Sequence, residues 1–175
     1  RPHGVLTVSD NGIGMTAEET EKYLGEVAFS GAADFAQRYE KAGDEGIIGH
    51  FGLGFYSAFM VAKDVAVDTL SYAEGAQPVL WESDGQSSYS LSDGTRTARG
   101  TDVKLHLNED DADFLEKAKV EEIIKKYCGF LPVPIYLTDL EEEEKKAEEA
   151  AKKAAEEAEK KAQEAQQAEG APAEA

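Results

Sequence analysis

Four short runs of strand-like sequence follow one another in the middle of the chain, and they limit the possible folds more than any other feature. The runs are residues 65–70, 79–82, 89–91 and 101–107. A glycine lies in each gap between them: Gly75, Gly85 and Gly94. Short strands joined through glycine turns are typical of β-hairpins. The sequence therefore predicts a mostly antiparallel sheet.

The last of these runs alternates most clearly between apolar and polar residues. Val103, Leu105 and Leu107 are expected to face inward, with Lys104 and His106 facing outward. Helical periodicity then appears at four positions spaced i, i+3, i+4 and i+7, namely Val120, Ile123, Ile124 and Tyr127. The segment Pro132-Val133-Pro134 is expected to stop that helix before an extended course over residues 135–137.

The first part of the chain combines a strand, a turn and a helix. Residues 5–9 read as a short buried strand that ends at Asp10. Thr16 and Glu19 have the spacing of a capping box, which predicts a helix from there to about Leu24. Residues 55–63 are apolar and rich in helix formers, so we expect a buried helix there. Together these elements predict an α+β fold, a two-layer sandwich with helices on one face of the sheet.

The composition of the chain changes after Leu140. From Glu141 onward no residue is aliphatic beyond alanine, aromatic or sulfur-containing, so this part cannot build a core. Glutamates stand four residues before lysines, as in Glu142 and Lys146, and such pairs stabilise isolated helices. We expect residues 1–138 to form one domain and residues 139–175 an acidic, partly helical linker or tail, with a coiled-coil partner as the lesser alternative.

The formal net charge of −18 at pH 7 is shared by both parts. An acidic surface repels nucleic-acid phosphates and anionic lipids, so neither is an expected partner. Cys128 is the only cysteine, which fits a reducing compartment. The longest apolar run, residues 51–62, is too short to cross a bilayer. A soluble, cytoplasmic protein is the expected class.

Asp10 opens the first of two glycine motifs, with the pattern D-x-G-x-G. A carboxylate buried at the end of an apolar strand needs a hydrogen-bond donor, and the exocyclic amino group of adenine is one. Gly12 and Gly14 allow a tight turn that leaves room for a base, and Met15 offers an apolar surface for its ring. In the alternative interpretation, Asp10 only caps the following helix. This motif alone does not separate the two.

The second motif is G-x-x-G-x-G, formed by Gly49, Gly52 and Gly54 before the expected helix. Backbone amides at a helix N-terminus can bind an anion. The motif differs from a Walker A loop because Phe55 stands where lysine would be, and from a Rossmann motif because no βαβ unit surrounds it. By itself it is weak, but after D-x-G-x-G it indicates a nucleotide pocket.

Other candidate groups are less informative. Thr101 opens the alternating strand, and its hydroxyl could point inward beside Asp10, although a plain turn is the simpler interpretation of Gly100-Thr101. The three histidines have no spacing suited to a metal ion, so no metal site is expected among these residues. Ser30 and Ser57 lack the G-x-S-x-G context of a serine hydrolase.

Over residues 1–138 the sequence resembles the GHKL ATPase superfamily with its Bergerat ATP-binding fold, and within it the ninety-kilodalton heat-shock chaperones of the bacterial, HtpG-like branch. The segments that carry the resemblance are SDNGIGMT at 9–16, AFSGA at 28–32, IGHFGLGFYSAFMVA at 48–62, RGTDVKLHL at 99–107 and IIKKYCGFLPVPIYL at 123–137. The resemblance implies an ATP or ADP ligand with Mg²⁺.

The resemblance also implies a set of nucleotide-binding residues: Asp10, Gly14, Met15, Leu24, Gly49, Gly52, Gly54, Phe55 and Thr101. Asp10 would bind the adenine amino group, and Thr101 would support it directly or through water. The three glycines of the second motif would contact phosphates and act as hinges. Residues 25–48, approximately, would form an ATP lid whose closure favours dimerisation.

Two departures from the family pattern affect these expectations. Tyr23 and Phe29 stand where family members often carry asparagine and lysine. The family's general-base glutamate and magnesium-binding asparagine lie on a helix before the strand at residues 5–9, and this chain contains no such segment. We therefore expect no catalytic residue in the chain, and little or no ATP hydrolysis by it alone.

The function implied by the resemblance is that of an ATP-dependent chaperone. In the intact protein, an ATPase-driven dimer cycle would act on non-native client proteins in the stress response. One alternative is a non-catalytic nucleotide-sensing or scaffold module, which Tyr23 and Phe29 leave open. Another is a different GHKL member of the MutL, gyrase B or histidine kinase type.

Overall fold

The computed structural model describes residues 4–25, 54–86 and 88–169, and it describes the side chains of these residues up to residue 155. The chain divides into two compact units, Arg1–Val120 and Glu121–Ala175. The first unit contains a five-stranded sheet whose strands are β1 Val5–Asp10, β2 Ala62–Leu70, β3 Val79–Ser83, β4 Tyr89–Asp93 and β5 Gly100–Leu107. The helices are α1 Ala17–Gly25, η2 Phe55–Met60, η3 Glu109–Leu115, α3 Lys117–Tyr127 and α4 Leu140–Glu169.

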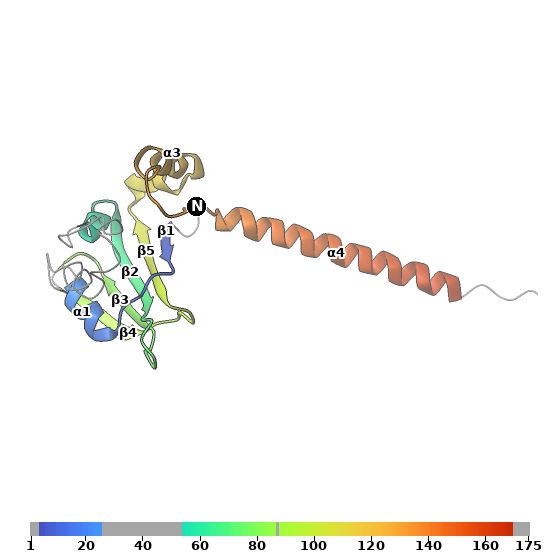
Figure 1. Ribbon diagram of the computed structural model, residues 1–175. Helices are drawn as coiled ribbons and strands as arrows, with labels where there is room; N and C mark the ends of the chain where they lie inside the picture. The colour runs from blue at the N-terminus through green and yellow to red at the C-terminus, as the bar shows by residue number, and fades with distance from the viewer. Residues whose placement is uncertain (1–3, 26–53, 87, 170–175) are drawn as a thin grey trace, which may run out of the picture. The chain divides into compact units, whose positions relative to one another are not determined.

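The strand order is β1-β5-β2-β3-β4, and every neighbouring pair is antiparallel. The last strand in sequence therefore lies between the first two, which Figure 1 shows as the yellow strand beside the blue one. The α+β fold with an antiparallel sheet is confirmed, and each of the five expected strands is present. The expectation that the first strand is buried is wrong, because β1 lies at the edge of the described sheet and its residues are partly or fully exposed.

One face of the sheet carries the core. Because directly opposed residues share a face, the register places Val8, Val103, Val67 and Trp81 in one row across four strands. The buried core residues are Ala62, Val65, Val67 and Trp81. Side chains from α1 and η2 pack against them, including Leu24 and Phe55. These two helices thus cover the same face of the sheet, as expected.

The capping box at the start of α1 is also confirmed. The Glu19 amide donates to the Thr16 hydroxyl over 3.2 Å, and the Thr16 amide donates to the Glu19 carboxylate over 2.9 Å. These reciprocal bonds satisfy two amides that a helix N-terminus otherwise leaves open. Local sequence chemistry therefore fixes the point where the chain turns from the glycine loop into α1.

The prediction of a buried helix over residues 55–63 is wrong in two respects. Only residues 55–60 form a helix, a 3₁₀ helix that ends at Met60, and no residue of this helix is fully buried. Strand β2 already begins at Ala62, which pairs with Leu107, and an irregularity in register follows before Asp64. Strand pairing with β5 thus outweighs the helical preference of these residues. Apolar runs this short do not distinguish the two structures.

The C-terminal unit contains α4, a helix of 30 residues. Its described side chains from Glu142 to residue 155 are exposed, which fits the expected acidic tail without a core. Lys146 donates to Glu142 one turn earlier over 2.6 Å. The hydrogen bond and the charge of Glu142 raise the pKa of Lys146. Among the described helices, none is long and apolar enough to cross a membrane.

We expect the helicity of α4 to decrease with added salt. Its Glu–Lys pairs are exposed, and salt weakens the attraction between such charges, since the Debye length falls to about 3 Å at 1 M ionic strength. Circular dichroism of a peptide covering residues 139–169 at low and high salt would measure this. A peptide of the same composition, with the lysines moved out of the i, i+4 spacing, is the control. Equal salt responses in the two peptides would contradict the prediction.

Candidate functional site

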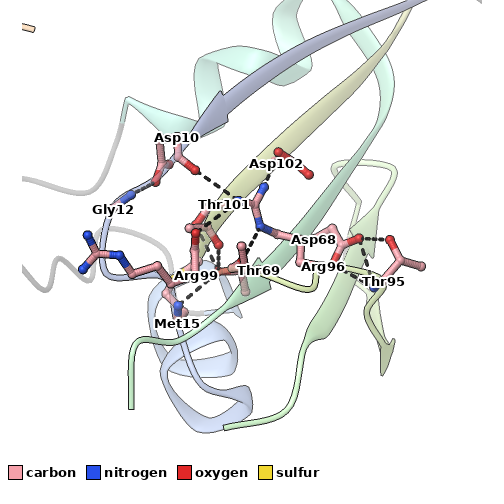
Figure 2. Close-up of polar contacts among 12 residues, drawn as sticks. Asp10, Gly12, Met15, Asp68, Thr69, Thr95, Arg96, Arg99, Thr101 and Asp102 are labelled. Atoms are coloured by element: carbon pink, nitrogen blue, oxygen red, sulfur yellow. Dashed lines mark hydrogen bonds and ion pairs between the residues drawn. The ribbon is translucent and has the colours of Figure 1, made fainter. Parts of the chain in front are cut away.

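Asp10, Thr101 and Thr69 form a polar row at one end of the core-bearing face. Asp10 is opposite Thr101, and Thr101 is opposite Thr69, so all three side chains belong to one face. Along β2 and β5, this row lies two residues away from the apolar row that contains Val67. Figure 2 shows these residues around the turn that leaves β1. The register thus places Thr101 opposite Asp10 on the neighbouring strand, although the sequence alone favoured a plain turn at Gly100-Thr101.

The Asp10 carboxylate holds the turn that follows it. Its Oδ1 accepts a hydrogen bond from the Gly12 amide over 2.8 Å. A Cβ on Gly12 would lie 2.9 Å from the same oxygen, which is closer than real Cβ contacts. Asp10 is exposed, so the expectation of a buried carboxylate is wrong for this structure. The reason is that Asp10 ends β1, which lies at the edge of the described sheet.

Gly14 packs closely against the end of β2. Its φ of +62° is a left-handed conformation that favours glycine. An added Cβ would lie 1.9 Å from the carbonyl oxygen of Leu70. The Tyr72 amide also donates to the Ile13 carbonyl over 2.7 Å, so the turn and the end of β2 are joined by main-chain contacts. The structure therefore favours glycine at position 14 whether or not a ligand binds.

Thr69 connects this turn to the sheet, and it was not among the residues predicted from the sequence. Its buried hydroxyl accepts from the Met15 amide over 3.0 Å and lies 3.0 Å from the Thr101 hydroxyl. It can also donate to the Gly100 carbonyl over 3.2 Å. If Thr69 instead donates to Thr101, the Thr101 proton is available to a ligand or to water. The alternation of Val65, Val67 and Thr69 along β2 is the signal that could have revealed it.

We expect Thr69→Val to destabilise the fold by about 1–3 kcal/mol, because the Met15 amide loses its acceptor in a partly buried position. Thr101→Val is the matched control and is expected to cost less, since Thr69 keeps its bonds to Met15 and Gly100. Urea denaturation followed by Trp81 fluorescence would compare the two. A larger loss for Thr101→Val would contradict this ranking.

The remaining predicted residues fall into three groups. Met15, Leu24 and Phe55 are partly buried and pack against the core, and the Phe55 ring meets Trp81 edge to face at 5.6 Å. Gly54 is exposed and precedes η2 with an ordinary right-handed conformation. Gly49 and Gly52 lie outside the described residues, as do Phe29, His50 and nearly all of the expected lid at 25–48.

Tyr56 links the two segments that flank residues 26–53. Its hydroxyl donates to the Leu24 carbonyl over 3.2 Å, which joins η2 to the last turn of α1. Burial raises the pKa of the Tyr56 phenol, which favours the neutral form that donates this bond. This contact brings Leu24 and Phe55 to the same side of the core.

The described residues at the end of β1 offer hydrogen-bonding groups beside a tight turn. The Asp10 carboxylate and the Thr101 hydroxyl lie in one row near the Gly14 turn, and the Met15 amide is bonded to Thr69 in the same row. No group of three or more His, Cys, Asp or Glu side chains that could hold a metal ion occurs in the described part of the chain. Any Mg²⁺ would therefore need ligands from the nucleotide phosphates or from outside these residues.

Comparison with known proteins assigns a family. Residues 1–109 match the family described as histidine kinase-, DNA gyrase B- and HSP90-like ATPase, and residues 113–175 match the family described as Hsp90 protein. The chain is 53% identical over 130 residues to chaperone protein HtpG of Bacteroides thetaiotaomicron. It is 51% identical over the same length to that of Porphyromonas gingivalis, and 43% identical over 151 residues to that of Vibrio vulnificus.

The matched region is a large part of this chain and a small part of each relative. It covers 74% of the chain and 19% of the Bacteroides thetaiotaomicron protein. For the Vibrio vulnificus protein the shares are 84% and 24%. The chain thus spans about a fifth to a quarter of the length of these relatives.

Proposed function

Because this chain belongs to the histidine kinase-, DNA gyrase B- and HSP90-like ATPases, and within them to the Hsp90 proteins, we propose that it is the ATP-binding part of an ATP-dependent molecular chaperone. The observation that carries the proposal is the row of Asp10, Thr101 and Thr69 beside the Gly14 turn. The names of the HtpG relatives support the chaperone role.

Asp10 is proposed to read the adenine base. One of its carboxylate oxygens already accepts from Gly12, which orients the group and leaves the other oxygen for the exocyclic amino group. Met15 and Leu24 would contact the ring, and Gly14 would hold the turn against the end of β2 beside the base. The Thr101 hydroxyl would contribute directly or through a water molecule.

Phosphate binding is proposed for the second glycine motif. Gly49, Gly52 and Gly54 would offer main-chain amides to the phosphates, and Phe55 would line the pocket on the side of the core. Residues 25–48 would form the lid. Mg²⁺ would accompany the phosphates and offset their charge, which would let this acidic chain bind an anionic ligand.

The whole protein is proposed to act through a cycle of dimer closure driven by ATP binding and hydrolysis. Its partners would be non-native client proteins and a second copy of itself, in the cytoplasm. Residues 1–138 would be the nucleotide-binding domain, and residues 139–175 a linker toward a further domain. The match of residues 113–175 to the Hsp90 protein family supports a continuation of that kind.

Base selectivity would test the proposal. Guanine presents a carbonyl oxygen where adenine has its amino group, so two acceptors would face each other at Asp10. We expect GDP to bind roughly 10–100-fold more weakly than ADP, which corresponds to about 1–3 kcal/mol for an unsatisfied polar group. Isothermal titration of both nucleotides with Mg²⁺ into the folded chain would measure this. Equal affinities would refute the role of Asp10 in base recognition.

A further inference from the structure

Arg96 lies in the loop between β4 and β5, and its guanidinium contacts several groups around the end of β1 (Figure 2). Its Nη1 forms an ion pair with the Asp102 carboxylate. Its Nη2 donates to the main-chain carbonyls of Asp10 and Arg99, each over 3.3 Å, and its Nε donates to the Ala98 carbonyl over 3.3 Å. Every nitrogen of the guanidinium therefore has an acceptor, and the Arg96 side chain is only 15% exposed.

The start of this loop is fixed independently by a buried carboxylate. Asp68 on β2 is 1% exposed, and both of its oxygens accept from the Thr95 amide over 3.1 Å. The Thr95 hydroxyl donates to the same carboxylate. Asp68 is opposite Asp102 in the register, so both acidic anchors lie on the face of the sheet away from the core. Arg96, next to Thr95, is held between these two anchors.

The end of the loop is in close contact with Asp10. Gly100 has a φ of +124°, and an added Cβ would lie 2.1 Å from the Asp10 carbonyl oxygen and 2.8 Å from Arg96 Nη2. The carbonyl that accepts from Arg96 is thus packed against the first residue of β5. Because Thr101 follows Gly100 directly, the same contact sets the position of Asp10 relative to the Thr101 hydroxyl.

We propose that Arg96 is a positioning residue for base recognition: it binds Asp102 and the Asp10 carbonyl together, and so holds the end of β1 against the start of β5. This inference rests on the proposed function, because it assigns to Arg96 the alignment of the Asp10 carboxylate with Thr101. The planar fork of arginine is required, since a lysine ammonium is one nitrogen and cannot reach the separated acceptors together.

The test compares Arg96→Met and Arg96→Lys with Arg99→Met, an arginine in the same loop whose side chain is exposed. Under conditions where every variant is folded, we expect Arg96→Met to weaken Mg-ADP binding about tenfold, as for the loss of one hydrogen bond to a charged group. Arg96→Lys should recover only part of this loss. Arg99→Met should remain within about twofold of the unmodified chain. An equal loss in Arg99→Met would overturn the proposal, because the loop charge alone would then explain the effect.

Amide hydrogen exchange without nucleotide provides a second readout. In Arg96→Met, the amides of Gly12 and Met15 should exchange faster, because their acceptors are Asp10 and Thr69. The Val67 amide, in the middle of the sheet, should be unchanged. Unchanged exchange at Gly12 and Met15, or equal acceleration at Val67, would overturn the proposal. If the folded chain binds no ADP, the proposed function fails, while the exchange result still decides whether Arg96 holds β1 against β5.

Discussion

Asp10→Asn is expected to weaken Mg-ADP binding roughly 100-fold while leaving the fold intact. The amide oxygen of asparagine can still accept from Gly12, as Asp10 Oδ1 does over 2.8 Å. Its NH₂ group would then stand where the second carboxylate oxygen was, opposite the amino group of adenine. Two donors would face each other, and a charged hydrogen bond of about 1.5–3 kcal/mol would be lost.

The matched control for this prediction is Asp93→Asn. Asp93 is also exposed and also ends an edge strand, β4, with its side chain on the same face of the sheet. The substitution removes one negative charge without touching the candidate site. In isothermal titration, Asp93→Asn should bind Mg-ADP with the affinity of the unmodified chain. Both variants should unfold at the same urea concentration as the unmodified chain. Equal affinities of Asp10→Asn and the unmodified chain would refute the assignment of adenine to Asp10.

Gly14→Ala is expected to destabilise the fold by about 2–5 kcal/mol. A left-handed conformation costs roughly 1–2 kcal/mol for a residue with a Cβ, and overpacking adds about 1–3 kcal/mol. Here the new methyl group would lie 1.9 Å from the Leu70 carbonyl oxygen, so the turn or the end of β2 must move. Because the fold's total stability is of order 5–15 kcal/mol, urea denaturation should show a large shift of the midpoint.

Gly75→Ala separates the two contributions to this loss. Gly75 has a comparable φ of +79°, but nothing lies within 4 Å of an added Cβ. The conformational cost remains and the collision is absent, so we expect a loss of only about 1–2 kcal/mol. An equal loss in both variants would show that the contact between Gly14 and Leu70 contributes little to stability.

The fold class could be predicted because its signals are local. Glycine turns, β-branched runs and the Thr16–Glu19 capping box act within a few residues, and the structure contains the expected strands and cap. The prediction of a helix over residues 55–63 was wrong. Its composition favours a helix, but Ala62 pairs with Leu107, some 45 positions away, and a distant pairing of this kind is not visible in a short window.

The candidate site could be predicted only in part. Asp10, Gly14, Met15 and Thr101 stand out because their motifs bring unusual residues together. Thr69 and Arg96 do not, since a threonine in a strand and an arginine in a loop are ordinary. Their importance depends on which strands are neighbours, and hairpin signals leave the position of β1 in the sheet undetermined.

The sequence by itself determined the strands, the antiparallel character of the sheet and the family, because turn chemistry, alternation and motif residues depend on positions that are close in the sequence. Only the tertiary structure decided that β5 lies between β1 and β2. That order is set by packing of the apolar face across distant strands. It brings Asp10, Thr101 and Thr69 into one row and Arg96 against the end of β1, and it leaves Asp10 exposed at the edge of the described sheet.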